Sequence, residues 1–307
     1  MNVQRKKKKF IVWMAGRALL ISTFASTMTV FAAMDVDSAE PVYKGSDLEE
    51  TWRGDTHKGQ YSTWEKPDSG FKVPAEYSNS IKATASTTHS SFGTTCAPSD
   101  VTDAWVKDHP NAEWTEIKDE VYAFDVKKNT KGQCGVWFRN ATIYDDAVKD
   151  NVLVDIKVTI TDWEDETSKT TNAHHITIQK DPKSNLNLVG LDQASMKWEF
   201  FRAGTNTPYN MKSNLTFDDV DAQQYLAFKP NNVAYQFVAE NTRLYYQYED
   251  GYNLYYNPDK TNYSNGDPRN AVGVAFEANT LQFIYGTKNN GTLTHYDYLG
   301  YLMRIRR

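Results

Sequence analysis

The sequence predicts an all-β fold, a two-sheet antiparallel β-sandwich of jelly-roll type. Segments that alternate apolar and polar residues recur along the chain, and turn-forming residues separate many of them. No window keeps a helical period for more than about two turns, apart from residues 98–109, where the pattern allows a short helix. About ten strands over roughly 200 residues fit a single sandwich domain, because sandwiches of this size often form one domain.

The first 32 residues have the parts of a secretory signal peptide. A basic start that includes Lys6–Lys9 is followed by a mostly apolar run over residues 10–33, with a small-residue exit at Val30-Phe31-Ala32. We therefore predict cleavage after Ala32 and an extracellular product, either secreted or associated with the cell wall. The alternative is an uncleaved anchor helix, which Arg17 disfavours. No later apolar run reaches the roughly 20 residues of a membrane span, so no span is expected after cleavage.

The chain is acidic. It has 34 Lys and Arg against 39 Asp and Glu, and its formal net charge is −5. Loss of residues 1–32 removes six basic residues and no acidic ones, which leaves about −11. A negative surface repels nucleic acid and anionic membranes, so neither is an expected partner.

Residues 33–92 form a polar, weakly periodic stretch. This composition predicts an extended, loop-rich lead-in with one or two strands. Its Trp52, Trp64 and Phe71 suggest that part of it docks on the β-sandwich domain, which we place at residues 93–307.

The clearest strand signal lies at residues 152–163. Val154, Ile156 and Val158 share one face with their apolar neighbours, whereas Asp155 and Lys157 lie on the opposite, polar face, where water is the expected neighbour. This period of two is typical of a half-buried strand. The other predicted strands are residues 120–125, 135–139, 175–178, 196–201, 225–228, 234–238, 271–276 and 280–285.

An acidic cluster follows the apolar Leu215-Thr216-Phe217. Asp218, Asp219 and Asp221 place three carboxylates in four positions, where one predicted strand ends and the next begins. Three acids this close cannot all be buried and ionised without a cation or several donors. One interpretation is a Ca²⁺ site at Asp219 and Asp221, although the spacing lacks the Gly and the distal Glu of a helix-loop-helix calcium loop.

The favoured interpretation of this cluster is architectural. The Asp side chains accept backbone N–H bonds in a sharp corner, while Gln223 and Gln224 pair with neighbouring strands. No cofactor is required in this interpretation.

No catalytic signature accompanies these acids. The stretch Asp162-Trp163-Glu164-Asp165-Glu166 does not match the Glu-x-Asp-x-x-Glu spacing of strand-borne glycosidases. His174 and His175 are adjacent, so on a strand they would point to opposite faces. We predict no catalytic residues and no enzymatic activity, and a glycan-cleaving enzyme of sandwich fold is the last-ranked alternative.

Tyrosine is concentrated in residues 243–258, where two predicted strands flank the turn Glu249-Asp250-Gly251. If the rings face solvent, they offer a surface for sugars or a peptide. Cross-strand packing that stiffens the hairpin is an equally good interpretation. The candidate ligand-binding residues are Tyr245, Tyr246, Tyr248, Tyr252, Tyr255 and Tyr256.

The chain contains two cysteines, Cys96 and Cys134. In an exported protein this number favours a single disulfide, and two independent thiols are the alternative.

Several of these segments together resemble a β-rich domain found near the N-terminus of Gram-positive cell-surface proteins, which often carry collagen-adhesin B-type or pilin-like repeats after it. The segments are residues 154–163, 196–201, 214–224 and 298–301, and the most specific one is Phe217-Asp218-Asp219-Val220-Asp221-Ala222-Gln223-Gln224. The resemblance covers residues 90–307. This chain has no such repeats and no sorting motif of the Leu-Pro-x-Thr-Gly kind, which leaves its attachment to a cell wall open.

The resemblance implies an adhesin-like, non-catalytic role, with a host or matrix protein or a surface glycan as the partner. The alternative function is a carbohydrate-binding module that uses the tyrosine hairpin.

Overall fold

The computed structural model describes residues 34–41, 81–82, 85–93, 98–108, 118–128, 130–145, 150–165, 174–182, 186–229, 233, 235–238, 242–263, 267–288 and 296–302. By its internal contacts the chain divides into two units, Met1–Val30 and Phe31–Arg307. All described residues belong to the second unit. None of its described helices is long and apolar enough to cross a membrane.

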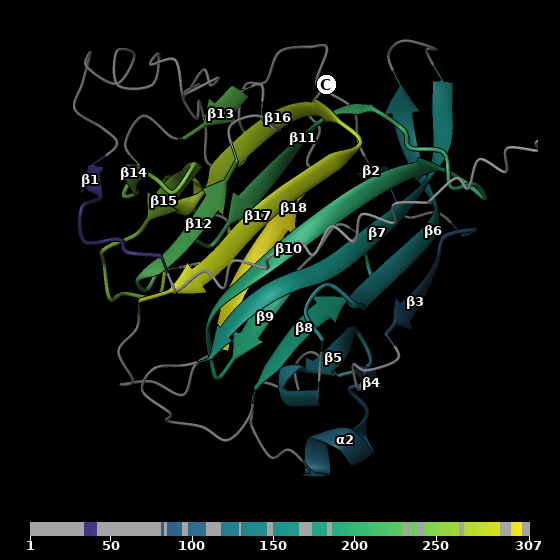
Figure 1. The fold of residues 1–307 in the computed structure, drawn as a ribbon, viewed down its shortest axis with the longest axis horizontal. Helices are drawn as coiled ribbons and strands as arrows, with labels where there is room; N and C mark the ends of the chain where they lie inside the picture. The colour runs from purple at the N-terminus through teal and green to yellow at the C-terminus, as the bar shows by residue number, and fades with distance from the viewer. Residues whose placement is uncertain are drawn as a thin grey trace, which may run out of the picture. The chain divides into compact units, whose positions relative to one another are not determined.

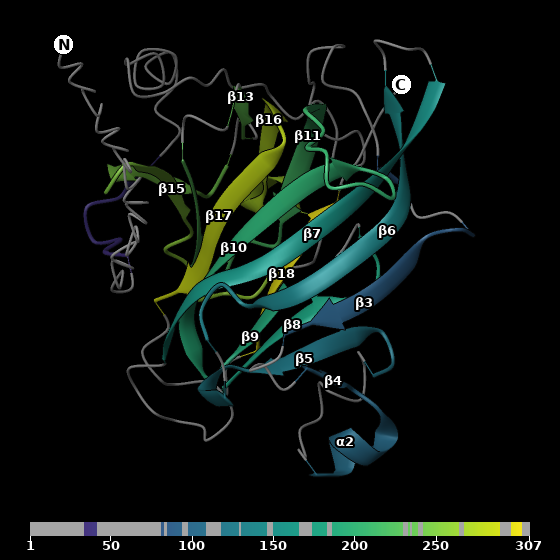
Figure 2. The ribbon, with the colours of Figure 1, turned by 45° about the vertical axis from the view of Figure 1, so that its right-hand side comes forward.

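The described residues form two antiparallel sheets, which confirms the predicted sandwich (Figures 1 and 2). The larger sheet has the order β1 (Glu40–Pro41), β14 (Tyr245–Glu249), β15 (Tyr252–Tyr256), β12 (Gln224–Phe228), β17 (Thr280–Thr287), β10 (Leu191–Arg202), β7 (Asp150–Asp165), β6 (Cys134–Asp145) and β2 (Ile81–Lys82), and β3 (Thr88–Phe92) also pairs with β6. The smaller sheet has the order β13 (Tyr235–Phe237), β16 (Val272–Ala278), β11 (Met211–Asp218), β18 (Tyr296–Leu302), β9 (Leu186–Val189), β8 (His175–Gln179), β5 (Val121–Asp125) and β4 (Pro98–Asp100). Short helical segments are α2 (Asp103–Asp108), η3 (Val126–Lys128) and η5 (Pro268–Asn270).

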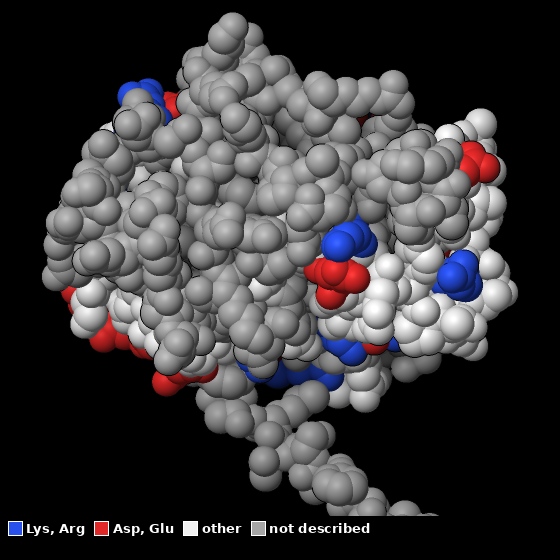
Figure 3. Space-filling model, turned by 90° about the horizontal axis from the view of Figure 1, so that it is seen from above, with Lys and Arg blue, Asp and Glu red and all other residues white. Residues whose placement is uncertain are grey.

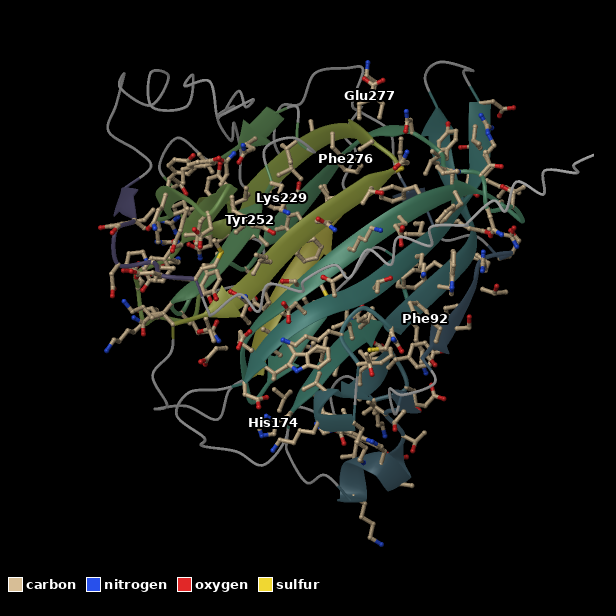
Figure 4. The ribbon with its side chains drawn as sticks, in the orientation of Figure 1. Phe92, His174, Lys229, Tyr252, Phe276 and Glu277 are labelled. Atoms are coloured by element: carbon tan, nitrogen blue, oxygen red, sulfur yellow. The ribbon has the colours of Figure 1, made fainter. Side chains whose placement is uncertain are left out.

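The hydrophobic core lies between the two sheets. Phe217 on β11 of the smaller sheet packs against Phe283 on β17 of the larger one, with ring centroids 4.9 Å apart. Phe276 on β16, labelled in Figure 4, stacks with Phe200 on β10 at 5.9 Å. These aromatic pairs lie between the two sheets, so they mark the face of the larger sheet that is directed to the core. We call the other face of the larger sheet its outer face.

Strand β7 confirms the predicted alternation but corrects the environment of one residue. Val154, Ile156 and Val158 are fully buried in the core. On the opposite face Lys157 is half-buried, but Asp155 is only 1% exposed, so the expectation that water surrounds it is wrong.

A β-bulge explains the burial of Asp155. The pairing of β6 with β7 shifts between Phe138 and Ala141, and Asn140 takes a φ of 56° there. The bulge lets Asp155 accept hydrogen bonds from the backbone N–H of Asn140 (2.9 Å), the backbone N–H of Gly204 (3.0 Å) and the Arg139 guanidinium (2.8 Å). Three donors replace water around one carboxylate.

Every strand predicted from the sequence overlaps an observed strand. The short helix predicted within residues 98–109 is α2, and the first three residues of that range form β4. Strands β2 and β3, from the predicted lead-in, pair with β6 of the larger sheet. Trp52, Trp64 and Phe71 lie outside the described residues, so their docking stays a prediction.

The segment Met34–Ala39 packs on the outer face of the larger sheet. Val36 is 3% exposed and lies in a cluster with Tyr225 and Leu254. The Met34 N–H donates to Gln193 Oε1 (3.2 Å), which also accepts from the Tyr225 hydroxyl (2.8 Å). The segment then continues into β1, which pairs with β14 at the edge of the sheet.

Candidate binding surfaces

The acidic cluster forms a corner that carries the chain from one sheet to the other. Strand β11 of the smaller sheet ends at Asp218, and β12 of the larger sheet begins at Gln224. Three residues of the corner have positive φ angles, namely Asp219 (68°), Ala222 (44°) and Gln223 (69°). Asp tolerates this backbone region better than most residues, because its short polar side chain can hydrogen-bond locally.

Asp221 connects this corner by a hydrogen bond to Tyr263, which lies far from it in the sequence. Its side chain is 1% exposed and accepts a hydrogen bond from the backbone N–H of Tyr263. Burial raises the pKa of Asp221 to about 6, and the Tyr263 N–H and the positive charge of Arg243 oppose that rise. Asp219 is also buried. These positions agree with an architectural corner.

The two glutamines join the corner to neighbouring strands, as expected. The Gln223 carbonyl accepts from the N–H of Lys288 (2.9 Å), and the Gln224 carbonyl accepts from the N–H of Asn257 (3.0 Å). Asn257 in turn donates its side-chain amide to the carbonyl of Val220 (3.1 Å).

An ion-pair network lies beside the corner. Asp267 binds Arg243 (2.8 Å) and Arg269 (2.7 Å), and the hydrogen bonds from Arg269 contribute most to holding the pKa of Asp267 below its usual range. Arg243 also lies over the ring of Tyr263, 3.9 Å from its centroid. The carboxylates of Asp221 and Asp267 therefore bind protein donors.

The described residues contain no group of three or more His, Cys, Asp and Glu side chains that would hold a metal ion. A Ca²⁺ site at Asp219 and Asp221 stays a prediction, which calcium removal tests below.

The tyrosine hairpin forms as predicted from β14 and β15, with Asp250 (φ 48°) and Gly251 (φ 84°) in the turn. Three of its six tyrosines, however, are buried. Tyr255 lies in the core, where its hydroxyl donates to Gln236 Oε1 (2.6 Å). Tyr252 and Tyr256 belong to the cluster around Val36 on the outer face, and Lys229 lies over the ring of Tyr252 at 5.2 Å (Figure 4).

Of the two interpretations of the hairpin, outward-facing rings are therefore wrong for Tyr252, Tyr255 and Tyr256, because the core and the Met34–Ala39 segment cover them. Tyr245 and Tyr246 are half-buried, and Tyr248 is 44% exposed. Ligand binding by the hairpin stays a prediction that depends mainly on Tyr248.

Cys134, the first residue of β6, is buried and disulfide-bonded. Cys96 is the only other cysteine of the sequence and lies outside the described residues. The pairing of Cys96 with Cys134 stays a prediction.

A second candidate surface, which the sequence analysis missed, lies on the outer face of the larger sheet. We call it the outer-face row and define it as Phe92 on β3, Trp137 on β6, Lys157 on β7 and Phe201 on β10. All four side chains are half-buried. The rings of Trp137 and Phe201 lie 5.6 Å apart, and the Lys157 ammonium lies 5.1 Å from the ring centroid of Phe92 and 5.6 Å from that of Trp137.

Strand register brings these four residues together. Trp137 lies opposite Lys157 across β6 and β7, and Asp155 lies opposite Phe201 across β7 and β10. Phe92, labelled in Figure 4, lies opposite Gly135. A Cβ at Gly135 would stand 1.9 Å from the carbonyl oxygen of Val158 and 3.0 Å from the ring of Phe92, so glycine permits the close approach there.

The charges around the row are mostly paired. Arg139 lies over the Trp137 ring, 3.6 Å from its centroid, and binds Asp155. Lys197 binds Glu199 at 2.7 Å. Within the described part of the chain, Lys157 contacts the two rings and no carboxylate.

One sequence signal marks this row. Trp137 lies between the core residues Val136 and Phe138, and Phe201 follows the core residue Phe200, so both rings occupy the polar phase of their strands. The register that unites them, however, depends on strands up to about 110 residues apart in sequence, which local patterns do not reveal.

No protein-family model matches the chain, and no curated protein matches its sequence. Among solved structures, the adhesin domain of PrgB from Enterococcus faecalis bound to DNA has a TM-score of 0.52 at 11% identity, over 80% of this chain and 98% of that one. The N-terminal domain of the Streptococcus gordonii adhesin Sgo0707 gives 0.44 at 11% identity over 75% of this chain, which spans 61% of that domain. Glucan binding protein C of Streptococcus mutans gives 0.45 at 9% identity, over 75% of this chain and 76% of that one. The chain thus shares its fold with the PrgB adhesin domain.

Proposed function

We propose that this chain is an exported, adhesin-like recognition domain of a Gram-positive cell surface and acts without catalysis. Its partner is a host or matrix protein or a surface glycan, and the contact surface is the outer-face row. The observation that carries the proposal is the placement of Phe92, Trp137 and Phe201 on the outer face of a sheet whose other face forms the core. Half-buried aromatic rings offer a large contact area at low entropy cost.

Two further observations support a binding role. The fold is that of an adhesin domain, as the comparison with PrgB indicates. Asp221 of the acidic cluster binds the Tyr263 N–H, and Asp267 beside the corner binds two arginines. Fold similarity alone does not determine function, so the proposal depends on the residues of the outer-face row.

Nucleic acid is not the proposed partner, although the PrgB structure contains DNA. This chain is acidic, with a net charge of −5. On the face seen in Figure 3, described basic side chains lie next to acidic ones near the centre. A nucleic-acid site usually needs a continuous basic surface, because most of its affinity comes from phosphate contacts.

The test is a panel of immobilised glycans and extracellular-matrix proteins, probed with the purified protein. We expect binding to at least one member, and we expect Trp137→Ala to weaken it about tenfold or more, since truncation of a buried aromatic hot-spot residue costs about 2 kcal/mol or more. Tyr248→Ala is the matched variant on the tyrosine hairpin and should bind as the wild type does. Loss of binding with Tyr248→Ala alone would favour the alternative, a carbohydrate-binding hairpin.

A further inference from the structure

We infer that the outer-face row binds an acidic polysaccharide, that is, a glycan whose sugars carry carboxylate or sulfate groups. This inference rests on the proposed function and names its ligand class.

The aromatic part of the row suits a chain of sugar rings. Phe92, Trp137 and Phe201 lie on three different strands and follow a diagonal across the sheet, from β3 through β6 to β10. Their spacing is set within the protein: Arg139 lies against the Trp137 ring, and Phe201 contacts the same ring. Flat, partly apolar sugar faces can pack on such fixed rings without ordering a mobile loop.

The charges next to the row favour an anionic ligand. In and beside the row, the described cations are Arg139, Lys157 and Lys197, and the acids are Asp155 and Glu199. Farther along β7 on the same face, Asp162 and Glu164 pair with Lys131. Both acids beside the row are engaged, because Asp155 accepts three hydrogen bonds and Glu199 binds Lys197.

Lys157 is therefore the one positive charge in or beside the row, within the described residues, that binds no carboxylate. Glu199 is its neighbour across the strands, but the Glu199 carboxylate binds Lys197. Around the row, Ser90, Thr280 and Gln282 are uncharged and complete its surface. The local balance is positive on a chain that is acidic as a whole, so charge complementarity attracts an anion to this place.

A polysaccharide fits this balance better than a nucleic acid does. DNA carries one negative charge per roughly 1.7 Å of duplex and requires many cations along its path. The row supplies one cation without a carboxylate partner, placed between two rings. One charge beside apolar ring surface matches a sugar acid, whose charge is local and whose ring faces are partly apolar.

Native gel electrophoresis through immobilised polysaccharide tests the inference. The probes are polygalacturonate, heparin, methyl-esterified polygalacturonate, in which the same sugars lack the charge, and single-stranded DNA. We expect polygalacturonate or heparin to retard the protein, and we expect the methyl ester to bind at least fivefold more weakly than polygalacturonate. Added salt should weaken the retardation, because the attraction is between partly exposed charges.

Matched variants locate the contact. Lys157→Gln removes the charge and keeps most of the stem, so binding to the acidic polymer should fall at least fivefold, whereas Lys157→Arg should retain it. Lys127→Gln in η3 is the control, because Lys127 is an exposed lysine with no described ion pair, and it should bind as the wild type does. Thermal unfolding of each variant shows that the fold is kept.

Three results overturn the inference. These are equal binding of the esterified and acidic polymers, tighter binding of single-stranded DNA than of either acidic polymer, and no binding to either acidic polymer. If the neutral ester binds and Trp137→Ala abolishes that binding, the proposed surface stands and only the acidic ligand class fails. If Trp137→Ala changes no binding in the earlier panel, the proposed function fails as well.

Discussion

Asp221 accepts a hydrogen bond from the backbone N–H of Tyr263, which follows it by 42 residues along the chain. This bond ties the corner between the two sheets to the segment after the tyrosine hairpin. Because Asp221 is buried there, its ionisation opposes folding, whereas the hydrogen bond itself supports it.

The first prediction concerns pH. The folded pKa of Asp221, about 6, lies above the ordinary value of 3.8, so its protonated form favours folding. The resulting stabilisation is fully present below about pH 4 and is lost as pH rises to about 6. The free energy of unfolding lost over this range is up to about 3 kcal/mol. Asp221→Asn keeps an oxygen acceptor and does not titrate. We expect the variant to gain stability relative to the wild type between pH 4 and 6.5 in urea unfolding. A constant difference between the two proteins over this range would contradict the assignment.

The second prediction concerns calcium. Asp221 already binds the Tyr263 N–H and lies near the positive charge of Arg243. A cation at Asp219 and Asp221 would compete with both. We therefore expect the melting temperature to be the same in excess calcium and in excess chelator. A rise of several degrees with calcium would instead support the metal interpretation of the corner.

The third prediction concerns the buried carboxylate of Asp155. Asp155→Ala leaves two backbone N–H groups and the Arg139 guanidinium without their acceptor, so the free energy of unfolding should fall by about 3 kcal/mol. Asp150→Ala is the matched control, because Asp150 is an exposed acid at the start of the same strand. Its cost should be within about 0.5 kcal/mol of zero. Equal effects of the two variants would show that the buried network adds nothing.

The fourth prediction concerns the disulfide. A bond from Cys134 to Cys96 closes a loop of roughly 40 residues and should add about 3–4 kcal/mol. We expect no reactive thiol in the unfolded, unreduced protein, and we expect Cys134→Ser to lower the melting temperature and to release one thiol. Two reactive thiols before reduction would rule out the pairing.

The sequence predicts the fold class well because strand alternation is a local property. The run from Val152 to Trp163 has a clear period of two, and β7 forms over it with its apolar side in the core. The corner at Asp219 and Asp221 can also be predicted from the sequence, because turn-forming residues act locally.

The surfaces were harder to predict because they depend on register and on distant segments. Asp155 looks exposed in the alternation, but the bulge at Asn140 and the backbone of Gly204 surround it. Tyr252 and Tyr256 look equivalent to Tyr248, but the Met34–Ala39 segment, about 200 residues earlier, packs in their cluster. Local sequence patterns predict neither the burial of Asp155 nor that of the two tyrosines.

Nuclear magnetic resonance of the labelled protein, titrated with a short galacturonate oligosaccharide, tests the central claim most directly. The account predicts that the indole N–H signal of Trp137 and the backbone signals of Lys157 and Phe201 shift together and saturate, while those of Tyr248 and Asp221 stay in place. Shifts centred on Tyr248 or on the corner, with Trp137 unaffected, would contradict it.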